Sequence, residues 1–461
     1  MHSTDKTRPA GLPPPPTGAR GGWRGLLAKL GKHRGKITAV FLGQVVTVLG
    51  LALGLRVLTE FTSPTALGEY KLAIGIVGLF SGLFFRPFTQ FVMRHYHDAV
   101  EHQEGRAFIA FGRRVIQFAS LILGAGLAIT LFWYGRTTVG LSWVAAAVGI
   151  GLLYLHVALS FQHGVLTTQN RQKSAILIRT TMQCATPLAV AAGAYALGQN
   201  GQFLLLAEFL LLALIFGVSA WWLRETGQIA AGAVPKERHR EWARDAVRFV
   251  TPLLGVSLFS WILGVSDRFI LAAYHLPHDV GLYTAVYGLG SQPMMMVTGM
   301  TTQLVYPFLF KAAAQKRADA QAQVLWYVVS TAAIAGALGM GALFIFGQQI
   351  IELLFAETYR VNALPLLLWV AAGYTLLGIA TSFELRAYAG KRTAVISIAY
   401  GLAAVVNLGL NLLWIPSDGA LGAARATFYG FLVYLVSIAI LTLKLRAVSG
   451  APQPNRINNS K

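Results

Sequence analysis

Long apolar segments separated by short polar connections recur along almost the whole chain. A membrane hydrocarbon core of roughly 30 Å is spanned by about 20 helical residues. The segments 37–58, 141–161, 324–346 and 424–443 reach that length without one acidic residue, and only isolated charges interrupt the other segments. The pattern therefore predicts an all-α integral membrane protein with twelve transmembrane helices.

The basic residues between the predicted spans distinguish the two sides of the membrane. If both termini lie on one side, that side carries 30 of the 38 Lys and Arg residues, and the other side carries only Lys71, Arg136 and Arg360. By the positive-inside rule, we expect both termini to be cytoplasmic. The spans are 37–58, 72–92, 116–134, 141–161, 175–197 and 203–223 in a first group of six, and 249–274, 280–305, 324–346, 364–383, 394–414 and 421–443 in a second.

Composition agrees with a membrane protein that contains no soluble domain. Hydrophobic residues make up 55% of the chain and charged residues 12%, with a mean hydropathy of +0.57, whereas about 25% of residues are charged in soluble domains. The net charge of +20 is explained by the positive-inside pattern, so we expect no nucleic-acid partner. Cys184 is the single cysteine, which excludes a disulfide framework and a thiolate metal site; we expect no metal and no cofactor.

Two similar motifs indicate an internal repeat. Arg56 is followed by a turn and Gly68, and Arg268 by a turn and Gly281, with a tyrosine two residues after each glycine. Because six spans separate the copies, the two halves run in the same direction, as parallel repeats do. The predicted domains are a disordered Pro-rich basic tail with a short interfacial helix at 1–35, an N-terminal lobe at 36–223, a cytoplasmic linker at 224–248, a C-terminal lobe at 249–445 and a cytoplasmic tail at 446–461.

Five arginines lie within or at the edges of the spans, where a charge is costly. Arg86 in the second span and Arg179 in the fifth lie deepest, and each would cost ~2.5–3.5 kcal/mol at a lipid-facing helix centre. Because guanidinium groups match the geometry of phosphate, we interpret them as lining a cavity for an anionic substrate. Pairing with an acidic residue or snorkelling to an interface are the alternatives. Further candidates for the cavity are Arg56, Arg268 and Arg425, the last of which is alternatively an interfacial anchor.

Three acidic residues lie in or beside the spans. Glu208 in the sixth span and Asp267 in the seventh are candidates for ion coupling, because a buried carboxyl group can carry a proton or bind a cation. Asp267 alternatively forms a helix-end pair with Arg268, and Glu384 is expected to form a surface ion pair near Arg386. Kinks are expected at Pro87, Pro187, Pro252 and Pro293.

Motifs of the common enzyme classes are missing. The chain has no phosphate-binding loop, no His-Glu-x-x-His sequence, no nucleophile elbow and no long polar loop that could house an active site. His95, His97 and His102 belong to a basic connection and are expected to be solvated. We therefore expect no catalytic residues and no enzyme activity.

These features resemble the polysaccharide-export flippases, among them the O-antigen flippases. The resemblance rests on residues 55–58 and 68–70, on the repeat at 267–269 and 281–283, and on 415–424 before the last span, and it extends over roughly 37–445. This family belongs to the multidrug/oligosaccharidyl-lipid/polysaccharide transporter superfamily, together with the multidrug and toxin extruders and the lipid II flippase. The Pro-rich tail departs from the short amino terminus usual in the family.

The resemblance implies a two-lobed transporter of the bacterial cytoplasmic membrane that moves an undecaprenyl-pyrophosphate-linked glycan outward by alternating access. It implies that cationic residues of the cavity bind the pyrophosphate and the sugars, here Arg86 and Arg179 first, then Arg56 and Arg268. The partners it implies are the lipid-linked anionic glycan and membrane lipids, with polysaccharide polymerase and glycosyltransferases as candidates. Two alternatives remain open: a cation-coupled multidrug exporter of the same superfamily, and a non-transporting scaffold that docks assembly enzymes through the tail and residues 236–248.

Overall fold

The computed structural model describes residues 34–134, 143–225, 236–314, 318–389 and 392–443. The chain divides into two compact units, residues 1–46 and residues 47–461. Of the first unit, only the beginning of one helix is described, and all that follows concerns the second. The predicted interfacial helix and the carboxy-terminal tail lie outside the described residues.

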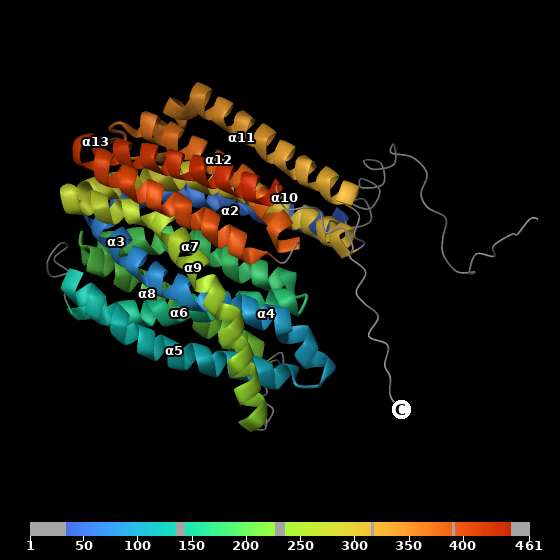
Figure 1. Ribbon diagram of the computed structural model, residues 1–461. Helices are drawn as coiled ribbons and strands as arrows, with labels where there is room; N and C mark the ends of the chain where they lie inside the picture. The colour runs from blue at the N-terminus through green and yellow to red at the C-terminus, as the bar shows by residue number, and fades with distance from the viewer. Residues whose placement is uncertain (1–33, 135–142, 226–235, 315–317, 390–391, 444–461) are drawn as a thin grey trace, which may run out of the picture. The chain divides into compact units, whose positions relative to one another are not determined.

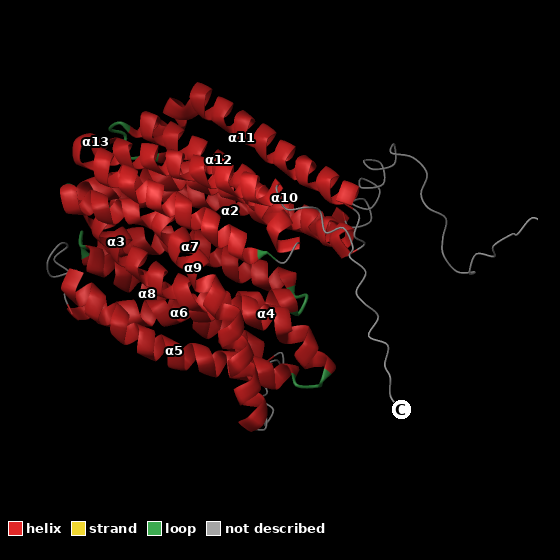
Figure 2. Ribbon diagram, viewed as in Figure 1, coloured by secondary structure: helices red, strands yellow, loops and turns green. Residues whose placement is uncertain are grey.

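All secondary structure among the described residues is helical, as Figures 1 and 2 show. This confirms the predicted all-α class. The first half contains α2 (Arg34–Phe61), α3 (Pro64–Phe80), the π-helix η1 (Ser81–Phe85), α4 (Arg86–Glu101), α5 (Gly105–Tyr134), α6 (Trp143–Thr168), α7 (Gln172–Leu197) and α8 (Gly201–Glu225). The second half contains α9 (Lys236–Tyr274), α10 (Pro277–Ala314), α11 (Ala318–Leu354), the short η3 (Glu357–Tyr359), α12 (Ala363–Ala389) and α13 (Thr393–Leu443).

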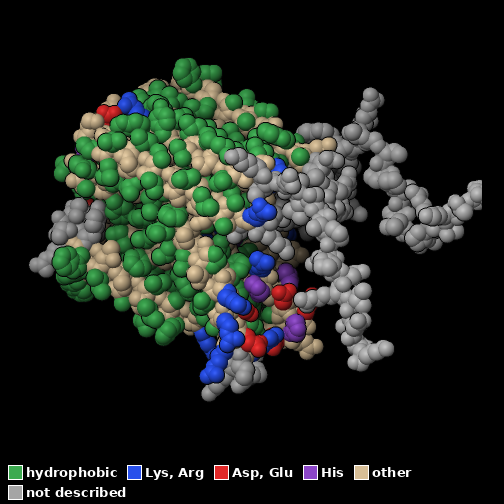
Figure 3. All heavy atoms as spheres, viewed as in Figure 1, with side chains coloured by type: hydrophobic (Ala, Val, Ile, Leu, Met, Phe, Trp, Pro, Cys, Tyr) green, Lys and Arg blue, Asp and Glu red, His purple; other side chains and the backbone are tan. Residues whose placement is uncertain are grey.

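The described part of each predicted span lies within helical structure. The second span is formed by α3, η1 and α4 in succession, and the last two spans lie on either side of a kink in α13. Nine helices within the described ranges are long and apolar enough to cross a membrane, judged by length and composition. Figure 3 shows hydrophobic side chains covering most of one face, with basic and histidine side chains gathered near the ends of α4 and α9. The number of twelve crossings stays a prediction.

Proline and glycine interrupt the helices at two places. Pro87 has no N–H to donate, and it is the second residue of α4, which begins directly after the π-helical turn that ends at Phe85. In α13, Pro416 is followed by Gly419, whose φ of 54° and ψ of −131° lie outside the helical region. Only glycine adopts this backbone conformation at little cost, so the chain turns there between the eleventh and twelfth predicted spans.

The two repeated motifs contact each other. Helices α3 and α10 begin with Pro64 and Pro277, and they pack together along their first turns. A Cβ atom on Gly68 would overlap the carbonyl oxygen of Pro277, and one on Gly281 would overlap that of Pro64. The glycines therefore allow a close, symmetric contact between the first and second halves.

The described part of the predicted linker is helical. Helix α9 starts at Lys236, and its residue Trp242 is 7% exposed and packs against Phe108 and Phe111 of α5. Nearby, Nε of Arg238 lies 2.8 Å from a carboxylate oxygen of Glu104. This part of α9 is consequently docked on the first half and is continuous with the first helix of the second half.

Candidate substrate-binding cavities

The first cavity, called cavity 1, has a volume of about 670 Å³ and is lined by elements of both halves. The first half contributes α3, η1, α4 and α6, and the second contributes α9, α10, α12 and α13. Its lining includes the cationic side chains Lys71, Arg86 and Arg268, together with His156. Among the described residues that line it, none is Asp or Glu. Cavity 1 is therefore suited electrostatically to an anion.

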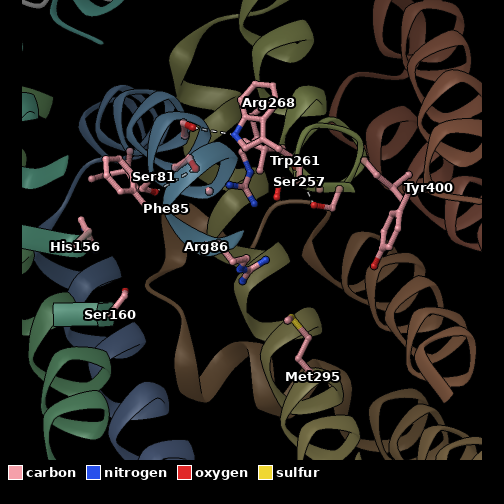
Figure 4. Close-up of a pocket in the computed structure, with 18 of the residues that line it drawn as sticks. Ser81, Phe85, Arg86, His156, Ser160, Ser257, Trp261, Arg268, Met295 and Tyr400 are labelled. Carbon is pink, nitrogen blue, oxygen red and sulfur yellow. Dashed lines mark hydrogen bonds between the residues drawn. The ribbon is translucent and has the colours of Figure 1, made fainter. Parts of the chain in front are cut away.

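Arg86 reaches cavity 1 because the π-helical turn ends directly before it. It is the first residue of α4, its side chain is exposed, and Figure 4 shows its guanidinium group within the cavity. No ion pair with Arg86 is formed by any described acidic residue. Its donors are therefore available to a ligand.

Arg268 enters the same cavity from α9 and is held by its neighbours. The backbone N–H of Arg268 donates to the buried carboxylate of Asp267 over 2.8 Å, and its guanidinium carbon lies 5.0 Å from the ring centroid of Tyr287. Its Nε is buried and has no hydrogen-bond partner among the described residues. The protein thus positions this guanidinium without using all of its donors.

Neutral polar and aromatic side chains complete cavity 1. Trp261 donates its indole N–H to the carbonyl oxygen of Gly75 over 3.0 Å, which links α9 to α3. Tyr400 donates to Glu384 over 3.3 Å. Hydroxyl groups and aromatic faces of this kind can bind sugars by hydrogen bonding and stacking. The serines of the lining are Ser81, Ser160, Ser257 and Ser260.

A second cavity, called cavity 2, has a volume of about 630 Å³ and a mostly apolar lining. It is formed by α2, α3, α6, α7, α8, α10 and α11, with Met182, Met294 and Met296 among its walls. Lys71 and His156 line cavity 2 as well as cavity 1. These two residues therefore mark the place where the two cavities meet.

Each repeated tyrosine donates to a buried acid of its own half. Tyr70 donates to Glu208 over 2.8 Å, and Tyr283 donates to Asp267 over 2.5 Å. Glu208 also lies 3.2 Å from Nε2 of His156 and lines cavity 2. Asp267 lines neither cavity. Their roles in ion coupling stay predictions.

The structure brings Arg86 and Arg268 together but places the other three candidate arginines elsewhere. Arg56 pairs with Glu60 over 2.9 Å, and Arg425 pairs with Asp418 over 2.7 Å. Neither arginine lines either cavity. Arg179 is exposed on α7 and lines neither cavity.

Two residues of the cavities do not follow from the sequence analysis, and one expectation is wrong. Lys71 falls before the predicted second span, yet α3 begins at Pro64 and carries Lys71 into both cavities. His156 is a lone histidine within an apolar span. Glu384 does not lie free on the surface, because it accepts hydrogen bonds from Tyr434 over 2.6 Å and from Tyr400.

Comparisons with known proteins place the fold. A family model described as polysaccharide biosynthesis protein matches residues 34–313. The structure is similar to the lipid II flippase MurJ in an inward closed conformation, with a TM-score of 0.66, 15% identity and 87% of each chain covered. An inward-facing multidrug resistance MATE family transporter of the MOP superfamily gives a TM-score of 0.64 and 16% identity over 87% of this chain and 94% of that chain.

A further similar structure is the MATE transporter VcmN of Vibrio cholerae, in a mutant form, with a TM-score of 0.64 and 12% identity over 91% of this chain and 97% of that chain. A search of curated proteins finds no match. At such low identities the likeness shows the fold alone. The chain is therefore a multi-pass membrane protein with the fold of the MOP transporters, which confirms the predicted fold class.

Proposed function

Because the chain belongs to the polysaccharide biosynthesis protein family, we propose that it is a flippase for an undecaprenyl-pyrophosphate-linked oligosaccharide. It would carry this lipid across the bacterial cytoplasmic membrane by alternating access, for the synthesis of O-antigen, capsule or exopolysaccharide. The observation that supports this most is the lining of cavity 1, where both halves contribute cations and no described residue is acidic. A MATE-like drug exporter for cations would place carboxylates there instead.

The physical chemistry of such a substrate fits cavity 1. A pyrophosphate and its sugars are too polar to cross hydrocarbon unaided, and a cavity between the halves lets them pass while hydrogen-bonded. Arg86 and Arg268 supply planar donor groups that match phosphate oxygens, and the serines and Trp261 contact the sugars. An inside-negative potential contributes ~2.3 kcal/mol per charge per 100 mV, so outward movement of two negative charges gains roughly 4 to 5 kcal/mol. No bond is made or broken.

The test is transport by the purified protein in liposomes. A fluorescent undecaprenyl-pyrophosphate-linked oligosaccharide is placed in both leaflets, and its exposure to an added membrane-impermeant quencher is followed over time. The wild type should accelerate flipping. A hydrogen bond to a charged group contributes ~1.5–3 kcal/mol, so Arg86→Ala and Arg268→Ala should each slow flipping about 10- to 150-fold.

Matched variants separate charge recognition from general damage. Arg86→Lys keeps the charge but loses the planar fork, so part of the flipping rate should return. Arg425→Ala is the control, since Arg425 is paired with Asp418 and lines neither cavity, and its flipping rate should equal that of the wild type. Wild-type flipping by both cavity variants, Arg86→Ala and Arg268→Ala, would refute the cationic cavity as the substrate site.

Cation-coupled drug export is favoured by one observation, the position of Glu208 in the apolar cavity 2. Both carboxylate oxygens of Glu208 already have partners, Tyr70 and His156, which leaves less capacity for a cationic drug. Efflux of a fluorescent cation from the same liposomes, lost in Glu208→Gln, would support export over flipping. A scaffold would do neither, and the burial of Trp242 against α5 removes part of the docking surface it would need.

A further inference from the structure

The two cavities differ in chemistry and share one boundary. Cavity 1 is polar and cationic, whereas cavity 2 is walled mainly by apolar side chains such as Met182, Met294 and Leu343. The residues common to both are Lys71 and His156. A ligand that is polar at one end, apolar at the other and anionic between them would match this arrangement.

We propose that cavity 2 binds the isoprenoid segment next to the pyrophosphate of the lipid substrate. In this arrangement the pyrophosphate lies where the two cavities meet, bound by Lys71 together with Arg86 and Arg268 of cavity 1. The sugars occupy the rest of cavity 1, and the first isoprene units occupy cavity 2. The proposal rests on the proposed function and adds to it a site for the lipid part.

The boundary has donors to spare for an anion. Glu208 and Lys71 both line cavity 2. The carboxylate of Glu208, however, accepts a hydrogen bond from Tyr70 and lies close to Nε2 of His156, and it forms no ion pair with Lys71. The ammonium group of Lys71 lies 5.0 Å from the ring centroid of Tyr70, and none of its N–H groups has a hydrogen-bond acceptor among the described residues. The Nε2 of His156 lies 3.2 Å from a carboxylate oxygen of Glu208, so this nitrogen already has an anionic neighbour within the protein. The ammonium group of Lys71 is thus the donor at the boundary that is available to phosphate oxygens.

The walls of cavity 2 fit a branched hydrocarbon chain better than sugars. A volume of about 630 Å³ lies in the usual range for ligand sites, ~300–1,000 Å³. Methionine side chains adapt to irregular apolar shapes, and three of them line the cavity. Sugar hydroxyls placed there would lose hydrogen bonds to water without replacement, which is unfavourable. An isoprenoid chain makes no hydrogen bonds to water and therefore loses none when it enters cavity 2.

The test compares two soluble probes that share the pyrophosphate. Inorganic pyrophosphate and farnesyl pyrophosphate are titrated into the full-length protein in lipid nanodiscs. Each CH₂ moved out of water favours binding by a factor of about four, so the farnesyl compound should bind at least ~100-fold more tightly even if few carbons are buried. Lys71→Met should weaken binding of both probes at least tenfold.

Glycines with open space beside them allow a matched set of cavity-filling variants. Gly288 lines cavity 2, Gly264 lines cavity 1 and Gly217 lines neither, and a Cβ on any of them would meet no atom within 4 Å. Gly288→Phe should weaken farnesyl pyrophosphate binding at least tenfold and change inorganic pyrophosphate binding less than twofold. Gly264→Phe should keep farnesyl pyrophosphate binding and block flipping of the oligosaccharide lipid. Gly217→Phe should change none of these.

A second measurement uses the wild-type protein, so that misfolding of a variant does not decide the outcome. A farnesyl pyrophosphate analogue with a photoreactive group at the far end of its chain should label peptides of α7, α10 and α11, which wall cavity 2. Labelling confined to α4, α9 and α12 would overturn the proposal. It would also be overturned if a photoreactive phospholipid acyl chain labelled cavity 2 and excess farnesyl pyrophosphate did not displace it.

The failure of this proposal differs from the failure of the proposed function. A protein that flips the oligosaccharide lipid but binds both pyrophosphates equally has no isoprenoid site, and only the present proposal is wrong. A protein that binds farnesyl pyrophosphate tightly but never flips the oligosaccharide lipid is not a flippase, and the proposed function is wrong.

Discussion

The close contact between Gly68 and Gly281 leads to a prediction. A single methyl group added at either glycine should separate the two halves where α3 and α10 begin. This contact joins the two halves at the end where α3 and α10 begin, which the predicted topology places on the outer side. Two hydrogen bonds reinforce it. Tyr359 donates to the carbonyl oxygen of Thr62 over 2.8 Å, and the N–H of Ala356 donates to the hydroxyl of Thr59 over 3.2 Å. Burial raises the pKa of Tyr359, so its hydroxyl stays protonated as a donor at physiological pH.

The magnitude follows from the overlap. In Gly68→Ala, the new Cβ overlaps the carbonyl oxygen of Pro277, and a backbone atom cannot move aside as a flexible side chain can. Overpacking of this kind costs about 1–3 kcal/mol, and it affects only the state in which the helices touch. A bias of 1–3 kcal/mol raises the open-to-closed ratio about 5- to 150-fold. Alanine is also the better helix former by ~1 kcal/mol, so helix weakening cannot account for opening.

The assay measures access to the contact from outside the cell. Thr62→Cys is a suitable reporter, because Thr62 is 3% exposed and its hydroxyl has no hydrogen-bond partner among the described residues. The native thiol is removed by Cys184→Ser. A membrane-impermeant maleimide should then label the reporter about 5- to 150-fold faster in Gly68→Ala than in the parent, and Gly281→Ala should have a similar effect.

Gly78→Ala is the matched control on the same helix, since a Cβ at Gly78 would meet nothing within 4 Å. Its labelling rate should equal that of the parent. Equal labelling of Gly68→Ala and Gly78→Ala, with normal flipping by both, would refute the idea that the glycine contact closes the outer side.

Three further predictions concern topology, the docked linker and the pathway. Alkaline-phosphatase fusions after Arg136 or Leu276 should be active and those after Arg171 or Arg240 inactive, because the basic residues predict cytoplasmic termini; the reverse pattern would contradict this topology. Trp242→Ala should cost about 3–5 kcal/mol, as for other buried aromatic residues, and should lower the midpoint of thermal unfolding, whereas an unchanged midpoint would mean that the packing against α5 contributes nothing. Deleting the gene should remove surface polysaccharide while complete lipid-linked repeat units accumulate on the cytoplasmic leaflet; accumulation of a truncated repeat would indicate a transferase or its scaffold.

The helical spans could be predicted because hydropathy is a local property of the sequence. The cavity lining was only partly accessible in this way. Arg86 followed from the cost of a charge in the middle of an apolar span. Lys71 did not, because the hydropathy falls at 69–71 and suggests a connection, although Ser63 and Pro64 are a typical helix start. A helix that begins at Pro64 includes Lys71 about two turns after its first residue.

Contacts between distant residues explain the remaining differences. Glu384 meets Tyr400 and Tyr434, which are 16 and 50 residues away in sequence, and no local pattern indicates that they surround it. By contrast, the pairing of Arg56 with Glu60 at a spacing of four residues is readable from the sequence. The position of Arg179 could not be predicted in this way. The energetic cost of a charge within a span predicts that Arg179 has polar surroundings, but it does not identify the cavity or the residues that supply them.

Helix α9 joins the residues that pack against α5 to the residues that line cavity 1. At about 1.5 Å per residue, the 26 residues from Trp242 to Arg268 separate the docking point on α5 from the cationic cavity by roughly 39 Å. Over the roughly 24 Å between Pro252 and Arg268, a bend of about 10° at Pro252 would move Arg268 by roughly 4 Å, more than the length of a hydrogen bond. Pro252 lies between the two ends and removes one backbone hydrogen bond, so bending is easiest there. A bend of α9 between Trp242 and Arg268 would therefore change where the Arg268 guanidinium lies in cavity 1.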